Sequence, residues 1–236
     1  MGRHLTIYTP RTGSTVVYNS ISQTLCDPPF NFNLEDFYSS EIHPCEYKLF
    51  YDKLKKLSNS NIDWSMKYLV STGVTHPEND DNFNLFDTDK FFKDLGVTDL
   101  HFCFRVDMID TICSNIIAEM DDSYVVTNGE IRKHEKRHVP KSLIDITCFK
   151  YNYDKILYNS YVSRYSNNFN SKFYHYENLH KFVDTDNDIH KLKKQLTKEQ
   201  KQELIINYDE VIEIAKTYDF YYGKINPMNG VLEYDK

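Results

Sequence analysis

Short apolar runs rich in β-branched and aromatic residues recur along the chain, and stretches with helical spacing separate them. Four of these runs have the length and composition of β-strands: residues 5–9, 64–71, 100–104, which is apolar enough to be buried, and 172–176. The first run ends at Pro10, and after a short polar loop the apolar residues over 16–25 return at helical spacing. The chain is therefore expected to begin with a strand, a tight loop and a helix.

The same periodicity predicts further helices between and after the strands. They cover residues 44–57, 91–95, 107–120, 143–165 (as one or two helices) and, as one long carboxy-terminal helix, about 197–218. Thr197 and Gln200 form a capping-box pattern at the start of that last helix. Asn128-Gly129 supplies the positive φ angles of a type I′ turn and predicts a small hairpin insertion over about residues 123–139.

The alternation of strands and helices indicates the fold class. It favours an α/β fold with a central, mainly parallel sheet flanked by helices. No repeat, low-complexity segment or linker divides the chain, so we expect a single domain over residues 1–236. In such sheets ligands bind beyond the carboxyl ends of the strands, which makes the residues after each strand the candidates for chemistry.

Composition and charge exclude several classes of protein. Hydrophobic residues make up 40% of the 236 residues and charged residues 27%, which excludes wholesale disorder. No apolar run reaches the ~18 residues that a membrane span requires. The formal net charge of −7 argues against general nucleic-acid binding, because phosphate contacts need a basic face. Five dispersed cysteines without zinc-ligand spacing are typical of reduced thiols in a cytoplasmic protein.

The first candidate site is the loop after the first strand, residues 10–15. Small residues between a strand and a helix start expose backbone N–H groups, which cradle an anion such as phosphate together with the helix dipole. Arg11 adds a permanent charge, and Ser14 and Thr15 add hydroxyl donors. The alternative interpretation is an ordinary helix capped by Ser or Thr. A Walker A loop is excluded, since no lysine precedes Ser14.

Two more polar candidates follow the third and fourth strands. Arg105 lies at a strand end, and Ser114 lies nine residues further along the next helix, so the two side chains could bind a second anion. The alternative is a surface arginine paired with Asp107 and a serine that faces solvent. After the fourth strand, Glu177 either caps a short helix or holds a cationic loop in place.

Three motifs in this order resemble one family. T-P-R-T-G-S-T (9–15), F-R-V-D with a later serine (104–114) and Y-H-Y-E-N-L (174–179) resemble the sulfotransferases that use 3′-phosphoadenosine 5′-phosphosulfate (PAPS), including bacterial and phage-type members. The motifs are similar, in turn, to that family's 5′-phosphosulfate loop, its 3′-phosphate motif and its late Y-E-x-L segment. The chain departs from the family in spacing, because eight residues after Arg105 would reach Cys113, and in lacking a late glycine-rich segment.

The resemblance implies a three-layer, P-loop-like fold and the transfer of a sulfuryl group from PAPS to a hydroxyl or amine, with 3′-phosphoadenosine 5′-phosphate (PAP) as product. The backbone of Thr12, Gly13, Ser14 and Thr15 would hold the 5′-phosphate. Arg11 would neutralise charge on the leaving oxygen, and Arg105 and Ser114 would select the 3′-phosphate. The implied enzyme is cytoplasmic and needs no metal, and it acts on a small-molecule or glycan acceptor with no nucleic-acid or membrane partner.

The catalytic base has several candidates. Residues 34–38 look like an L-x-E-F-F-type segment of phage and bacterial members, which makes Asp36 and Glu35 the first choices. Lys67 matches a lysine often found on the corresponding strand of the family. Other candidates for the base are Glu46, His43, His76 and His101. The basic stretch 132–138 is either a solvated face or an arm that closes over the nucleotide.

Two other functions remain open at the level of sequence. One is an ATP-dependent phosphotransferase on a P-loop-like fold, against which the missing Walker lysine argues. The other is a nucleotide-binding module on the same fold that has lost catalysis.

Overall fold

The computed structural model describes residues 2–25, 30–33, 63–70, 88–121, 134–181 and 196–234. Its elements, in chain order, are β1 (Arg3–Tyr8), α1 (Ser14–Thr24), β2 (Phe30–Asn33), β3 (Trp64–Leu69), α3 (Thr88–Leu95), β4 (Asp99–Phe104), α4 (Met108–Met120), α5 (Lys141–Tyr165), β5 (Asn170–His175), the 3-10 helix η3 (Tyr176–Lys181), α6 (Lys198–Leu204), α7 (Tyr208–Ala215), the 3-10 helix η4 (Asp219–Tyr222), β6 (Lys224–Ile225) and β7 (Leu232–Glu233).

A five-stranded parallel sheet in the order β2-β3-β1-β4-β5 forms the centre of the fold. In register, Leu5 of β1 faces Met66 of β3 on one side and Leu100 of β4 on the other. The predicted α/β class with a central parallel sheet is therefore confirmed. The connection after β1 leads to β2 at one edge of the sheet, and the connection after β4 leads to β5 at the other edge. The two connections therefore diverge from the carboxyl ends of β1 and β4. Such a divergence is where open α/β sheets bind ligands.

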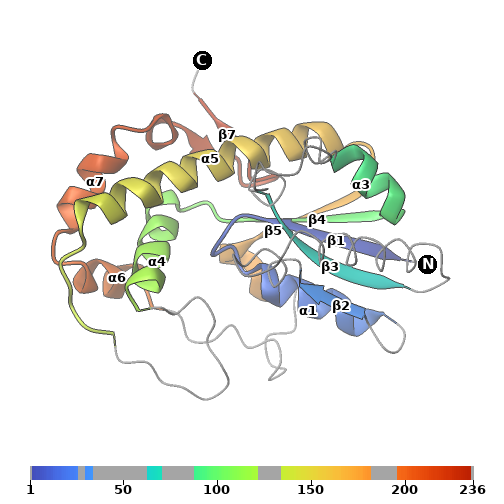
Figure 1. Cartoon of the computed structure of the whole chain (residues 1–236), viewed down its shortest axis with the longest axis horizontal. Helices are drawn as coiled ribbons and strands as arrows, with labels where there is room; N and C mark the ends of the chain where they lie inside the picture. The colour runs from blue at the N-terminus through green and yellow to red at the C-terminus, as the bar shows by residue number, and fades with distance from the viewer. Residues whose placement is uncertain are drawn as a thin grey trace, which may run out of the picture.

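Helices cover both faces of the sheet (Figure 1). Helices α3 and α5 lie over one face and α1 lies on the other. Alternation along β1 separates the two layers, since Leu5 and Ile7 belong to the large core under α3 and α5. Tyr8 instead packs with Val17 and Ile21 of α1. The period-two pattern of the strand therefore determines which helix each side chain meets.

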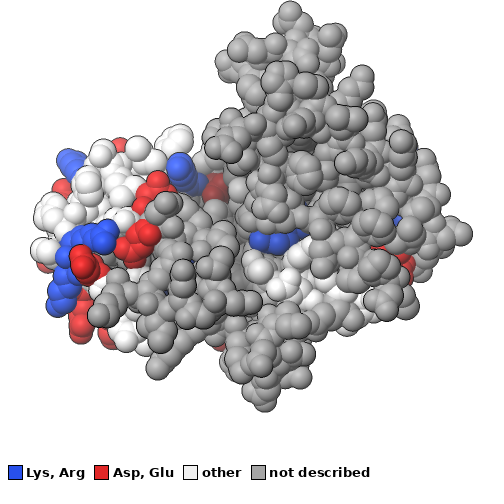
Figure 2. Space-filling model, turned by 60° about the horizontal axis from the view of Figure 1, so that its bottom comes forward, with Lys and Arg blue, Asp and Glu red and all other residues white. Residues whose placement is uncertain are grey.

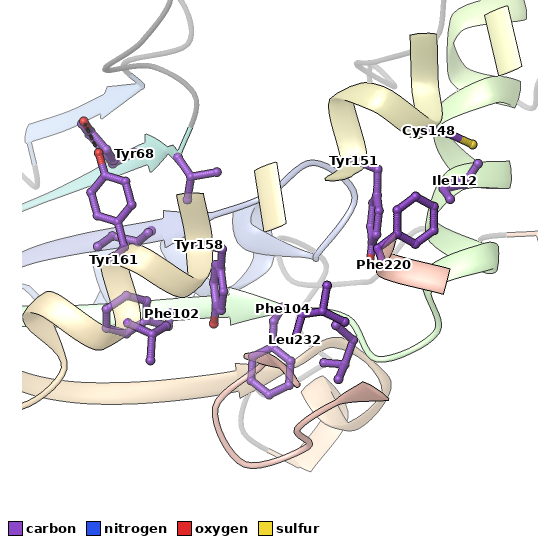
Figure 3. Packing of buried hydrophobic residues seen from close by; sticks show 14 of the residues in the cluster. Tyr68, Phe102, Phe104, Ile112, Cys148, Tyr151, Tyr158, Tyr161, Phe220 and Leu232 are labelled. Carbon is purple, nitrogen blue, oxygen red and sulfur yellow. Dashed lines mark hydrogen bonds between the residues drawn. The ribbon is translucent and has the colours of Figure 1, made fainter. Parts of the chain in front are cut away.

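Aromatic side chains dominate the larger core layer (Figure 3). Tyr68 of β3 and Tyr161 of α5 are joined by a hydrogen bond of 3.0 Å between their hydroxyls, which satisfies two buried polar atoms. Nearer the start of α5, the rings of Tyr151 and Phe220 of η4 pack in an edge-to-face arrangement. These contacts fasten the single 25-residue helix α5 across the whole layer. No described helix is both long enough and apolar enough to cross a membrane.

The predicted carboxy-terminal helix over 197–218 is wrong as a single element. The Thr197–Gln200 capping box is present, but the helix ends at Leu204 and α7 begins at Tyr208. Between them the backbone pairs with a distant segment: Ile206 N–H donates to Arg137 O, and Arg137 N–H donates to Leu204 O. Groups engaged in this bridge are unavailable to an intrahelical ladder, so the helix is interrupted.

Other differences between the predicted and the observed elements concern short strands and segments outside the described residues. The strands β2, β6 and β7 are additional to the four predicted from periodicity. The β6–β7 turn carries Gly230 at φ 73°, where a Cβ would lie 2.3 Å from the Phe104 ring, so only glycine fits. The predicted helix over 44–57 and the Asn128-Gly129 turn lie outside the described residues.

Candidate functional site

The loop between β1 and α1 has the backbone of a tight cradle. Arg11 and Gly13 both adopt left-handed conformations, with φ of 62° and 72°. Thr12 is buried and donates its hydroxyl to Thr9 O at 2.7 Å, which ties the loop to the end of β1. A Cβ on Gly13 would lie 2.4 Å from Leu179 Cδ1, so the loop requires glycine there.

The start of α1 is open rather than capped. Gly13 is the N-cap residue and makes no side-chain cap, while Ser14 and Thr15 are already inside the helix. The alternative of an ordinary Ser or Thr cap is therefore wrong. Because the first N–H groups of a helix lack intrahelical acceptors and carry the positive end of the helix dipole, this end is suited to an anion.

Lys67 of β3 reaches this loop from the neighbouring strand. Its side chain is buried, and Nζ donates to Thr15 Oγ1 at 3.2 Å. The ammonium also lies 4.8 Å from the centroid of the Tyr8 ring. Lys67, which was singled out because it matches a lysine of the family that the chain resembles, thus lies directly at the start of α1.

Arg105 follows β4 and is buried next to that loop. Its Nη1 lies 3.5 Å from Ser114 Oγ, so the two predicted residues come together at the observed nine-residue spacing. Cys113 instead belongs to the hydrophobic core. The alternative of a surface arginine paired with Asp107 is wrong. The Arg105 guanidinium forms a buried ion pair with Asp110.

Asp110 links Arg105 to a further buried cation, which is not among the site residues predicted from the sequence. Lys201 of α6 donates from Nζ to Asp110 Oδ1 at 2.7 Å, and both side chains are buried. Burial and the like charges of Arg105 and Arg11 lower the pKa of Lys201 to about 8, against the opposing influence of Cys113 and Asp107.

Arg11 belongs to the same electrostatic environment. Burial lowers the pKa of its guanidinium; the Tyr176 phenol opposes this shift and the charge of Arg105 adds to it. Three cations, Arg11, Arg105 and Lys201, therefore share one region with the carboxylates of Asp110 and Glu177. Cationic side chains beside an uncapped helix start are the arrangement expected of an anion site.

A sequence signal for Lys201 existed. It stands three residues before Leu204 and seven before Tyr208, within the apolar stripe of its helix. A lysine in that position either snorkels to solvent or is buried with a partner. Only the fold could identify the partner as Asp110, 91 residues earlier in the chain.

His101, another candidate for the base, does not lie at the carboxyl end of β4. It pairs in register with Thr6, in the middle of the sheet. Its ring nitrogens contact His4 Nδ1 at 3.0 Å and the Tyr174 hydroxyl at 3.1 Å. Burial, and then the neighbouring charge of His4, lowers the pKa of His101 to about 3, so the ring is neutral and enclosed.

The remaining candidates for the base lie outside the described residues: Glu35, Asp36, His43, Glu46 and His76. Part of the basic stretch 132–138 is described, and it is tied to the end of α4. His134 Nδ1 lies 2.6 Å from Asp121 Oδ2, and Arg137 Nη1 donates to Met120 O at 2.8 Å. These contacts place basic groups at a helix carboxyl end, where they stabilise the helix dipole.

Charge on the visible described surface is mixed (Figure 2). At the left of that view, lysine and arginine side chains lie beside aspartate and glutamate side chains. Within the described ranges, no group of three or more histidine, cysteine or acidic side chains is arranged to hold a metal ion.

Neither the models of known protein families nor the curated proteins contain a match to this chain.

Proposed function

We propose that this chain is a PAPS-dependent sulfotransferase, which moves a sulfuryl group from PAPS to a hydroxyl or amine and releases PAP. One observation carries the proposal: Arg11 and Arg105 follow adjacent strands and converge, beside an uncapped helix start, where the connections of the sheet diverge. Two separated phosphate groups of one nucleotide match two such centres. The strand order with a small-residue loop after β1 also supports a P-loop-like fold.

In this proposal the β1–α1 loop holds the 5′-phosphosulfate. The N–H groups of Thr12 to Thr15 donate to its oxygens, and Lys67, already at Thr15, adds a charge. The acceptor's oxygen or nitrogen attacks sulfur, the bond from sulfur to the bridging oxygen breaks, and PAP leaves with the electron pair. Arg11 stabilises the negative charge that develops on that oxygen. Asp36 or Glu35 is the proposed acceptor of the proton.

The Arg105 side of the site is proposed to take the 3′-phosphate. Ser114 is already within reach of the guanidinium, at 3.5 Å, and Lys201 approaches from α6. Asp110 opposes a second anion there, but its charge is shared between Arg105 and Lys201. Glu177 also lies 3.9 Å from Arg105 Nε, so the positive charge that remains for a phosphate comes from Arg11 and the start of α1.

The Arg105–Asp110 ion pair also favours a second candidate, a nucleotide-binding module without transfer activity, because a neutralised arginine selects a phosphate less strongly. Ligand-induced stabilisation separates the candidates. The protein is melted with PAP, AMP and ATP–Mg²⁺, since a ligand specific to the native state raises Tm by mass action.

We expect PAP to raise Tm most, and labelled PAPS to donate its sulfuryl group in a screen of hydroxyl and amine acceptors. A larger shift with ATP–Mg²⁺ would indicate a phosphotransferase and overturn the proposal. Strong PAP binding without transfer to any acceptor class would leave the binding module as the function.

A further inference from the structure

The segment η3, which follows β5, touches both candidate anion-binding centres. Tyr176 and Leu179 pack against Gly13 of the β1–α1 loop, as the 2.4 Å and 3.1 Å distances from a Cβ built there to Leu179 Cδ1 and Tyr176 Cδ2 show. The Tyr176 ring also lies over Arg105, with its centroid 4.1 Å from Cζ. One short segment is thus in contact with the loop after β1 and the arginine after β4.

Glu177 fixes the turn that presents Arg105. Its Oε1 accepts hydrogen bonds from Val106 N–H at 3.1 Å and from Asp107 N–H at 3.2 Å. The same carboxylate lies 3.9 Å from Arg105 Nε and 2.8 Å from His175 Nε2. Hydrogen bonds to a charged acceptor are among the stronger ones, so the turn between β4 and α4 is held firmly.

The guanidinium of Arg105 is therefore held on three sides. Asp110 binds one edge, Glu177 attracts the Nε side, and the Tyr176 ring covers one face. Without Glu177, both the turn and the Nε side would be released, and the side chain would be free to rotate fully onto Asp110. An arginine is useful to a ligand only while its fork is kept in the orientation that the ligand needs.

We infer that Glu177 is a positioning residue for Arg105: it does not touch the ligand, but it holds the β4–α4 turn and the guanidinium in the orientation that binds the more distant phosphate of a nucleotide. The inference rests on the proposed function for the identity of that phosphate. It predicts that loss of Glu177 weakens only ligands that reach Arg105.

The test compares PAP with AMP, which keeps the 5′-phosphate and lacks the 3′-phosphate. Affinities are measured by calorimetry for the wild type, Glu177→Ala, Glu177→Gln and a control, Glu119→Gln, which alters an exposed glutamate on α4. We expect Glu177→Ala to weaken PAP about tenfold or more and AMP less than about twofold. Glu177→Gln should lie between, since its amide oxygen still accepts from the two N–H groups but carries no charge.

Equal weakening of PAP and AMP, or an unchanged PAP affinity, would overturn the inference. If Glu177→Ala does not fold, Glu177→Gln is judged by the same PAP-to-AMP comparison. Failure of the proposed function is seen separately, as a wild type that binds PAP no better than AMP. In that event the NMR signal of the Arg105 Nε–H decides: it should shift in Glu177→Gln and stay in place in Glu119→Gln, and an unmoved signal in both overturns the positioning role.

Discussion

Single side chains determine the electrostatics of this site, and Arg11 is the most direct test of it. Arg11 is half-buried and its backbone is left-handed, a conformation that arginine and alanine adopt at about the same cost. Arg11→Ala should therefore leave the free energy of unfolding almost unchanged. We expect the transfer rate to fall by about 10²–10³, as for the loss of one group that stabilises the transition state. Single-turnover assays with PAPS measure this, and an undiminished rate would remove Arg11 from the mechanism.

The pairing of Arg105 with Ser114, rather than with Cys113, leads to a second prediction. Ser114→Ala removes a hydroxyl 3.5 Å from Nη1 and should weaken PAP by about 1 kcal/mol, without affecting AMP. Cys113→Ala removes a core side chain and should lower stability instead, with PAP affinity retained. Calorimetric titration and denaturant unfolding of both variants give the comparison. Loss of PAP affinity in Cys113→Ala alone would reverse the assignment.

Lys155 on α5 leads to a third prediction, about stability. Its ammonium is buried without a hydrogen-bond partner among the described residues, 5.1 Å from the Tyr158 ring centroid. Burial lowers the pKa of Lys155 from 10.5 to about 8, with Asp154 and Glu177 opposing the shift. Between these two pH values the unfolded chain binds more protons than the folded chain, so the free energy of unfolding should rise with pH in that window.

Replacing Lys155 by methionine tests this prediction, because the new side chain has a similar length and no charge to bury. Lys155→Met should raise the free energy of unfolding at pH 7 by about 1–3 kcal/mol, and the rise between pH 8 and 10.5 should be reduced. Urea unfolding across that range is the measurement. A destabilised variant with an unchanged pH profile would contradict the account of a costly buried ammonium.

At the scale of elements, the break between α6 and α7 is stabilised by specific hydrogen bonds. Asn207 secures it, since its Oδ1 accepts from Val139 N–H at 2.8 Å and its Nδ2 donates to Val139 O at 3.0 Å. Asn207→Ala leaves two half-buried backbone groups without partners and should cost about 1–3 kcal/mol of stability. Thermal unfolding measures the loss, with the exposed Asn168→Ala as a control of the same chemistry. A smaller loss for Asn207 than for Asn168 would contradict the role given to the bridge.

Elements that depend on local sequence patterns could be predicted, and elements that depend on contacts between distant parts of the chain could not. The four predicted strands, the helix start after Pro10 and the capping box at Thr197 depend on local patterns, and all of them were predicted to within a few residues. The interruption after Leu204 depends on Arg137, far away in the chain, so no local pattern contained it. The strand β2 is only four residues long, too short for periodicity to reveal.

The candidate site shows the same division. Arg11 and Arg105 follow strands, and Ser114 lies on the helix after Arg105, so their positions could be read from the order of the strands and helices. Asp110 and Lys201 meet through a contact between α4 and α6, and a contact across 91 residues leaves no trace in local spacing.

At the scale of the whole molecule, the order of the strands determines when this chain can fold during synthesis. The strand β1 emerges first but lies at the centre of the sheet, and it pairs with β3 and β4, which are about 60 and 95 residues further along the chain. Loop closure must be completed before those pairings return any stability, so β1 has neither native partner until Leu69 has been made and lacks the second until Phe104 has been made. We therefore expect slow folding, and a need to protect the nascent β1, as kinetic consequences of placing the candidate anion-binding loop after the central strand.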